Sequence, residues 1–126
     1  MARAGKTVLC IDDHKSAVAG WCLYLQSAGY RVETAFDATE GLQLFATQPI
    51  DLVLLDYAMP DANGAEVAAT MKQIKPEVRI LMFSGVTHIP EGARTHVDAF
   101  LEKGQLPTVV LGKIDELLCE PTQGAA

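Results

Sequence analysis

The segment Asp51-Leu-Val-Leu-Leu-Asp56 decides the fold class, because four consecutive apolar residues lie between two aspartates. A strand that is apolar on every residue is buried on both faces, which is typical of the central strands of a parallel sheet. Ile80-Leu-Met-Phe83 has the same character. Together the two segments predict the centre of a parallel sheet with helices on both of its faces.

Outward from this pair, short strand-like segments alternate with segments of helical period along the chain. The predicted strands are residues 7–11, 31–35, 51–56, 79–84 and 99–102. This alternation predicts an α/β fold with a doubly wound parallel sheet. The segment from Arg31 to Ala35 alternates polar and apolar residues, which indicates an edge strand with one wetter face.

Apolar residues recur at helical spacing between and after these strands. The stripes are Val18, Cys22 and Leu25; Leu42 and Phe45; Val67, Met71 and Ile74; and Val110, Ile114 and Leu117. Their spacing predicts amphipathic helices whose stripes face the sheet, the first over residues 16–28. Asp37 and Glu40 have the spacing of a capping box at the start of the second helix.

The connection over residues 86–98 is the exception. It contains Pro90 and Gly92 and has no apolar stripe at helical spacing. The residue before a proline is biased away from the α region, and glycine costs a helix about 1 kcal/mol. We therefore predict one short turn or an irregular loop in place of a full fourth helix.

The chain has 126 residues, 49% of them hydrophobic and 21% charged, which predicts one globular domain. Its formal net charge of −6 argues against direct nucleic-acid binding, which needs a basic surface. The sequence contains neither an apolar run of membrane-spanning length nor a signal-peptide core. Cys10, Cys22 and Cys119 have no metal-ligand spacing, so we expect reduced thiols and a cytoplasmic location. Residues 120–126 are expected to form a frayed tail.

Chemically capable side chains stand where four of the predicted strands end. The first strand ends in Asp12-Asp13, the third in Asp56, the fourth in Ser84 and the fifth in Lys103. The carboxyl ends of parallel strands share one edge of the sheet, where such folds bind ligands. Three crowded carboxylates repel one another unless a cation lies between them, and Mg²⁺ prefers oxygen ligands. A carboxylate beside such an ion, with an ammonium and a hydroxyl nearby, is equipped to accept a phosphoryl group.

This ordered set resembles the receiver domain of bacterial response regulators. The resemblance also rests on Met59-Pro60 after the third carboxylate and on Gly64. It covers about residues 7–118 and implies a single receiver domain over residues 1–126. It further implies a flavodoxin-like (β/α)5 fold whose five parallel strands lie in the order 2-1-3-4-5.

The resemblance implies a role for each residue at this edge. Asp56 would be the phosphoacceptor of a two-component phosphorelay. Asp12, Asp13 and Asp56 would bind Mg²⁺ together with the main-chain carbonyl of Ala58. Ser84 and Lys103 would contact the phosphoryl group.

Phe100, three residues before the lysine, occupies the aromatic switch position, whose rotamer the family couples to Ser84. A plain core aromatic is the alternative interpretation of Phe100. The resemblance implies a signalling domain that phosphorylates itself, not a turnover enzyme. Its partners would be a histidine kinase or phosphotransfer protein as donor and a downstream protein target. The oligomeric state, and whether the domain stands alone or belongs to a larger regulator, are left open by the sequence.

The residue after the lysine departs from the family, as does the linker over residues 86–98, which is about one helical turn shorter than usual. Lys103 is followed by Gly104 where the family usually has proline, so we expect a trans peptide or a looser loop in which glycine absorbs the strain. Ala58 and Val86 offer no group that could orient an attacking water. This absence predicts a long-lived acyl phosphate.

Other functions fit the residues less well. A phosphatase of the haloacid dehalogenase type would need a second aspartate where Ala58 stands, and a flavodoxin would need a phosphate-binding loop rich in Ser, Thr and Gly. A receiver-like scaffold that acts without phosphorylation stays open. Asp61 is interpreted as a turn or cap residue. The histidines are assigned no role and are His14, His88 and His96.

Overall fold

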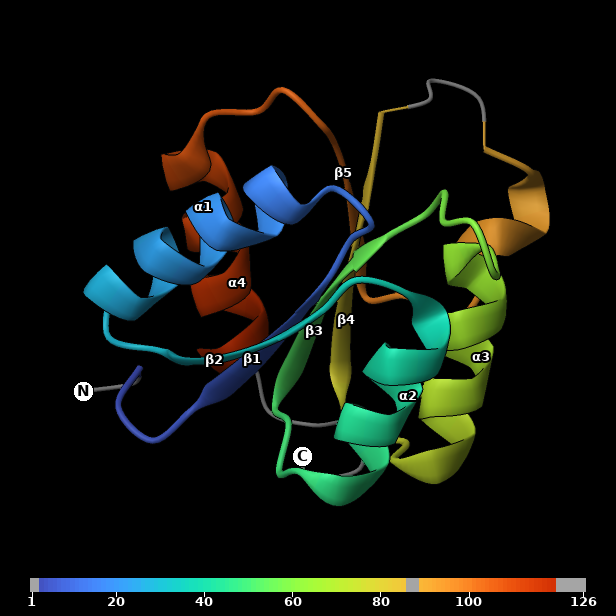
Figure 1. Ribbon diagram of the computed structural model, residues 1–126, viewed down its shortest axis with the longest axis horizontal. Coiled ribbons are helices and arrows are strands. Elements are labelled where there is room, and N and C mark those ends of the chain that lie inside the picture. The colour runs from blue at the N-terminus through green and yellow to red at the C-terminus, as the bar shows by residue number, and fades with distance from the viewer. Residues whose placement is uncertain (1–2, 86–88, 120–126) are drawn as a thin grey trace.

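The computed structural model describes residues 3–85 and 89–119 and contains one five-stranded sheet. All strand pairs are parallel, and the strands lie in the order β2-β1-β3-β4-β5 (Figure 1). Their bounds are β1 Thr7–Ile11, β2 Arg31–Ala35, β3 Leu52–Asp56, β4 Arg79–Ser84 and β5 Ala99–Glu102. The predicted flavodoxin-like fold and strand order are confirmed. Strand β3 begins one residue later than predicted, and the Asp51 carboxylate accepts a hydrogen bond from the Thr7 amide at 2.8 Å.

Four α-helices cover the sheet. They are α1 Lys15–Ser27, α2 Ala38–Thr47, α3 Gly64–Ile74 and α4 Pro107–Cys119. Helices α1 and α4 lie on one face, and α2 and α3 lie on the other (Figure 1). Within the described ranges, none of these helices combines the length and apolarity that a bilayer crossing requires.

The core forms one layer on each face of the sheet. Strand β3 is buried at every residue and β4 at every residue after Arg79, as their apolar segments predicted. Strand β1 is also buried at every residue. Phe45 and Met71 fill the layer under α2 and α3, while Leu25 and Ile114 fill the layer under α1 and α4. The prediction that Ile74 is buried is wrong: its side chain is 51% exposed, because it is the last residue of α3.

The connection between β4 and β5 contains only the short 3₁₀ helix η1, Glu91–Arg94, within the part of it that the structure describes. The prediction of a short turn in place of a full fourth helix is confirmed for residues 89–98. Residues 86–88 and the predicted frayed tail, 120–126, lie outside the described residues.

Two aspartates organise the start of α2. The Asp37 side chain accepts the Glu40 amide as predicted, but Glu40 accepts the Phe36 amide instead of closing a capping box on Asp37. Asp61 accepts the amides of Ala38 and Thr39 from the loop after β3. The interpretation of Asp61 as a cap residue is confirmed, and its bonds fix that loop beside α2.

Candidate functional site

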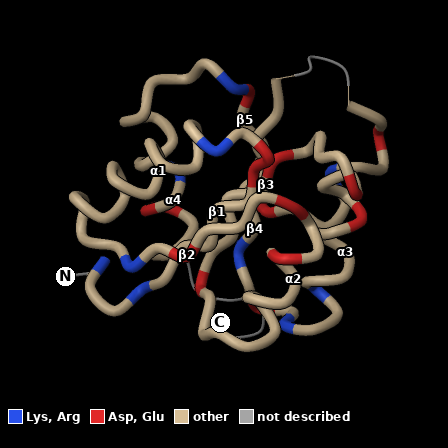
Figure 2. The backbone as a smooth tube through the Cα atoms, viewed as in Figure 1, with Lys and Arg blue, Asp and Glu red and all other residues tan. Residues whose placement is uncertain are grey.

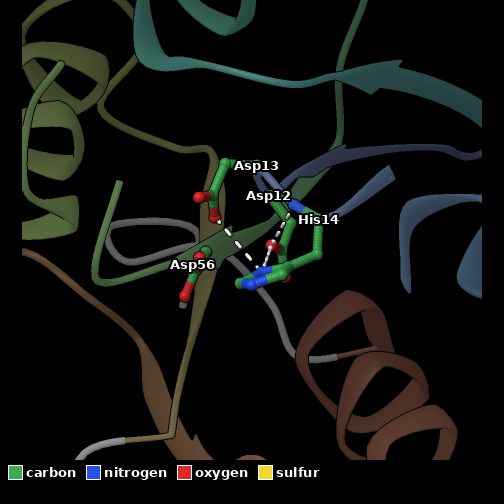
Figure 3. A group of neighbouring side chains, drawn as sticks. All are labelled: Asp12, Asp13, His14 and Asp56. Atoms are coloured by element: carbon green, nitrogen blue, oxygen red, sulfur yellow. Dashed lines mark hydrogen bonds and ion pairs between the residues drawn. The ribbon is translucent and has the colours of Figure 1, made fainter. Parts of the chain in front are cut away.

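The site lies where the chain changes direction across the sheet. β1 and β3 are neighbours, yet α1 after β1 and α3 after β3 lie on opposite faces. Open α/β sheets bind ligands at the carboxyl ends of the strands at such a reversal. Asp12 and Asp13 follow β1, and Asp56 is the last residue of β3. Figure 2 shows acidic segments gathered at this end of the sheet, and Figure 3 shows the side chains themselves.

The three carboxylates are close enough to share one ion. Asp12, Asp13, Asp56 and His14 each offer a ligand atom, and these atoms all lie within 4.8 Å of one another. Around an octahedral ion with bonds of about 2.1 Å, ligand atoms are about 3.0 Å apart when adjacent and about 4.2 Å apart when opposite. The 4.8 Å limit for this cluster is about 0.6 Å above the larger of these distances, so small side-chain movements suffice to place its atoms around a single divalent cation.

Asp13 provides the clearest sign that a cation belongs here. Its Oδ1 atom is buried and has no hydrogen-bond partner among the described residues. The His14 Nδ1 atom lies 3.3 Å from this oxygen, within ion-pair distance, but the two atoms do not form a hydrogen bond. A buried carboxylate oxygen without a donor is costly, and a cation removes that cost. The residues present fit Mg²⁺.

Lys103 bridges two of the carboxylates. Its Nζ atom lies 3.0 Å from Asp12 Oδ2 and 3.2 Å from Asp56 Oδ1. The backbone holds it there, because the Lys103 amide donates to the Ser84 carbonyl at 2.7 Å. The predicted convergence of the lysine on the acidic edge is confirmed for its contacts with Asp12 and Asp56.

The pKa values of the two buried carboxylates, Asp12 and Asp56, shift in opposite directions. Burial, and then the charge of Asp12, raise the pKa of Asp56 to about 6, although Lys103 opposes the shift. Burial alone would also raise the pKa of Asp12, but hydrogen bonds from His14 and Lys103 outweigh it and lower that pKa. Burial would lower the pKa of Lys103, but its bonds to Asp12 and Asp56 raise it. The site therefore holds Asp12 as an anion and destabilises charge on Asp56.

The other predicted residues surround this centre. Ser84 is 1% exposed and ends β4, one residue after Phe83, which pairs with Asp56 on β3. The Lys103–Gly104 peptide is trans and Gly104 has a φ of 99°, so glycine absorbs the turn as expected. Ala58 is exposed in the loop after Asp56 and pairs with Asn63. Its carbonyl as a metal ligand stays a prediction, as does the switch role of Phe100. Val86 lies outside the described residues.

Gly64 allows the loop after β3 to pass close to the site. Its amide donates to the Tyr57 carbonyl, and a Cβ atom on it would lie 2.8 Å from the Asp56 carbonyl oxygen. A side chain at position 64 would therefore collide with the backbone after β3, which explains sterically why the sequence motif has glycine there.

The contacts of three residues near the site were not predicted from the sequence. His14, assigned no role, has its Nδ1 atom 3.0 Å from Asp12 Oδ1. Asp98 accepts bonds from Lys72 and from the Ile80 amide, which ties the end of the linker to α3 and β4. Arg94 stacks on Phe100. For these contacts, the only indication in the sequence was that His14 directly follows Asp12 and Asp13.

Comparison with known proteins gives a consistent result. The profile of the response regulator receiver domain matches residues 8–114. The transcriptional regulatory protein PhoP of alkaline phosphatase synthesis, from Bacillus subtilis, is 37% identical over 63% of this chain and 33% of its own length. The chain therefore spans about a third of that relative.

Solved structures agree in fold. The CheY-like receiver domain protein of Methanospirillum hungatei superposes with a TM-score of 0.86 at 29% identity, over 90% of this chain and 93% of that one. The response regulator TrrA of Thermotoga maritima, solved in complex with Mg²⁺-BeF, has a TM-score of 0.84 at 27% identity, over 89% and 98% of the two chains. With the sheet order, the acidic cluster and the family match in agreement, this chain belongs to the response regulator receiver domain family.

Proposed function

We propose that Asp56 accepts a phosphoryl group from a phosphohistidine donor when Mg²⁺ is bound, and that this modification switches a protein-interaction surface. The observation that carries the proposal is the gathering of Asp12, Asp56 and the Lys103 ammonium within ion-pair distance at one edge of the sheet. That TrrA was solved with Mg²⁺ and beryllofluoride, a phosphoryl mimic, supports it by similarity.

Each side chain at the site has a different role in the proposed transfer. A carboxylate oxygen of Asp56 forms a bond to phosphorus while the P–N bond of the donor breaks, and the donor imidazole leaves with that electron pair. Lys103 and the Ser84 hydroxyl contact phosphoryl oxygens and stabilise their charge. Asp12, Asp13 and the Ala58 carbonyl would hold Mg²⁺ together with Asp56. Bound there, the ion supplies positive charge that screens the incoming phosphoryl group.

The rest of the proposal concerns the setting of this reaction. The domain acts as a signalling module and not as a turnover enzyme, with a histidine kinase or phosphotransfer protein as donor and a downstream protein as target. We place it in the cytoplasm, where its free cysteines stay reduced; they are Cys10, Cys22 and Cys119. Ala58 beside the acceptor has no group to orient a water, so the acyl phosphate is expected to be long-lived.

The test is phosphorylation by acetyl phosphate, read by intact mass. The protein should gain one phosphoryl group with Mg²⁺ present and none with a chelator, and the adduct should be lost to hydroxylamine as an acyl phosphate is. Asp56→Asn should gain none. Metal-independent labelling, or labelling that survives in Asp56→Asn, would overturn the proposal. Failure of labelling despite intact metal binding would favour the scaffold alternative, and decay within seconds would contradict the long lifetime.

A further inference from the structure

His14 places an imidazole nitrogen at a site whose other ligands are oxygens. Its Nδ1 atom lies 3.0 Å from Asp12 Oδ1 and 3.3 Å from Asp13 Oδ1, and the ring belongs to the group of ligand atoms around Asp56 (Figure 3). Both distances match the separation of adjacent ligands on one ion, which is about 3.0 Å.

We propose that His14 is a fourth side-chain ligand that shifts the metal preference of the acidic pocket from Mg²⁺ toward borderline ions such as Co²⁺. The inference rests on the proposed function, because it needs the same pocket to bind a cation. Imidazole suits Co²⁺, Ni²⁺ and Zn²⁺, whereas Mg²⁺ prefers carboxylate, carbonyl and water oxygens.

The ring is free to take this role. The His14 side chain is 68% exposed, so solvent can accept its second N–H when Nδ1 presents a lone pair to the cation. In the metal-free protein the same atom is placed to donate to Asp12. Asp12 does not depend on the ring, because the His14 backbone amide also donates to Oδ1 at 2.9 Å and Lys103 contacts Oδ2.

A pure hydrogen-bonding role for the ring is the competing explanation. A donor to Asp12 would orient that carboxylate and strengthen the binding of every divalent ion. A ligand would strengthen the binding of borderline ions and leave Mg²⁺ nearly unchanged. The ratio of the two dissociation constants, Kd for Mg²⁺ over Kd for Co²⁺, therefore separates the explanations.

The experiment measures both constants by calorimetry at about pH 8, where free imidazole is neutral. His14→Ala removes the ring, and His14→Gln keeps an amide donor that can reach Asp12 but offers a metal only an oxygen. Both variants should lower the Mg²⁺-to-Co²⁺ ratio about tenfold or more, with Mg²⁺ binding changed less than about threefold. In the wild type, Co²⁺ should shift the ring-proton NMR signals of His14 far outside the diamagnetic range, while those of the exposed His96 should stay in place.

Each other outcome overturns the inference. An unchanged ratio in both variants, or a His14 signal that Co²⁺ leaves in place, would show that the ring is not a ligand. Mg²⁺ and Co²⁺ affinities that fall together in His14→Ala and return in His14→Gln would assign the effect to hydrogen bonding. If the wild type binds Co²⁺ and Mg²⁺ but substitutions of His14 do not change the ratio, the proposed function stands and only this inference fails. If the wild type binds neither ion, the inference and the proposed function both fail.

Discussion

The guanidinium carbon of Arg94 lies 4.2 Å from the centre of the Phe100 ring. Arg94 is the last residue of η1, and Phe100 belongs to β5. The short helix in the linker thus contacts the residue that the sequence resemblance places at the aromatic switch position. Cation–π contacts at exposed sites contribute about 0.5–1 kcal/mol, which is enough to influence where a four-residue helix settles.

Removing this contact should loosen η1. Arg94→Ala is expected to raise amide hydrogen exchange across Glu91–Arg94 about two- to fivefold in the unphosphorylated protein, because local opening loses that stabilisation. Phe100→Leu should do the same, since it keeps an apolar side chain but removes the π face. Arg31→Ala, at an exposed position on edge strand β2, is the control. Exchange in Arg94→Ala equal to that of the control would contradict the coupling.

Asp56 should make the metal-free protein less stable as pH rises. Its pKa in the folded protein is about 6, above the ordinary 3.8, so its stabilising contribution is complete below about pH 4 and is lost as pH rises through about 6. Asp56→Asn should therefore exceed the wild type in unfolding free energy by about 1–3 kcal/mol near pH 7.5 and lose that advantage near pH 4.

Urea unfolding in the presence of a chelator measures this difference. Glu77→Gln removes an exposed carboxylate and should leave the pH dependence of the wild type unchanged. Saturating Mg²⁺ should shrink the advantage of Asp56→Asn, because the ion neutralises the same repulsion. A difference that does not vary with pH would refute the electrostatic account of the site.

Asp13→Asn should separate metal binding from stability. The unpartnered Oδ1 atom makes Asp13 the carboxylate with most to gain from a cation, so the variant should lose Mg²⁺ binding. Trp21 fluorescence should report the loss, because the Trp21 and Phe83 ring centroids are 5.7 Å apart. Phe83 in turn pairs with Asp56 across the sheet. Removing one of three crowded charges should also stabilise the metal-free fold. Weaker metal binding together with lower metal-free stability would be inconsistent with like-charge repulsion.

Lys103→Met should keep metal binding and lose phosphorylation. The three carboxylates remain in the variant, but it lacks the ammonium that lies 3.2 Å from Asp56 and would pair with phosphoryl oxygens. Fluorescence titration with Mg²⁺ and labelling by acetyl phosphate measure the two properties in one sample. Lys113→Met, which breaks only the pair with Glu116 on α4, is the matched control. Labelling of Lys103→Met at the wild-type rate would remove the lysine from the proposed chemistry.

The sequence predicted the strands and the acidic edge because both depend on local pattern. The apolar segments before Asp56 and before Ser84 had to be central strands, and parallel strands bring their carboxyl ends together. Even the shortened linker followed from Pro90 and Gly92. The prediction of each strand, strand end and turn depended on a short stretch of neighbouring residues.

Contacts between distant segments could not be predicted in this way. Asp61 caps α2 from the loop after β3, and Asp98 gathers Lys72 from α3, because the fold brings them together. His14 was missed for a different reason. Whether a loop histidine turns toward the preceding carboxylates or toward solvent depends on the rotamer, which no spacing in the sequence specifies.

Gly64 should be irreplaceable, whereas Gly112 should not. A Cβ atom at Gly64 would lie 2.8 Å from the Asp56 carbonyl oxygen and 2.9 Å from the Tyr57 Cα atom. Both are backbone atoms, so relief requires moving the backbone of Asp56 and Tyr57. Gly64→Ala is expected to lower the unfolding free energy by about 1–3 kcal/mol and to weaken Mg²⁺ binding.

The control is Gly112→Ala in the interior of α4, where an added Cβ meets no atom within 4 Å among the described residues. It should raise the unfolding free energy by about 0.5–1 kcal/mol, because alanine loses less backbone entropy in a helix than glycine does. Urea unfolding and Mg²⁺ titration of both variants give the comparison. A Gly64→Ala protein with wild-type stability and metal affinity would show that the loop after β3 can move without disturbing Asp56, and that the close approach of Gly64 does not position the site.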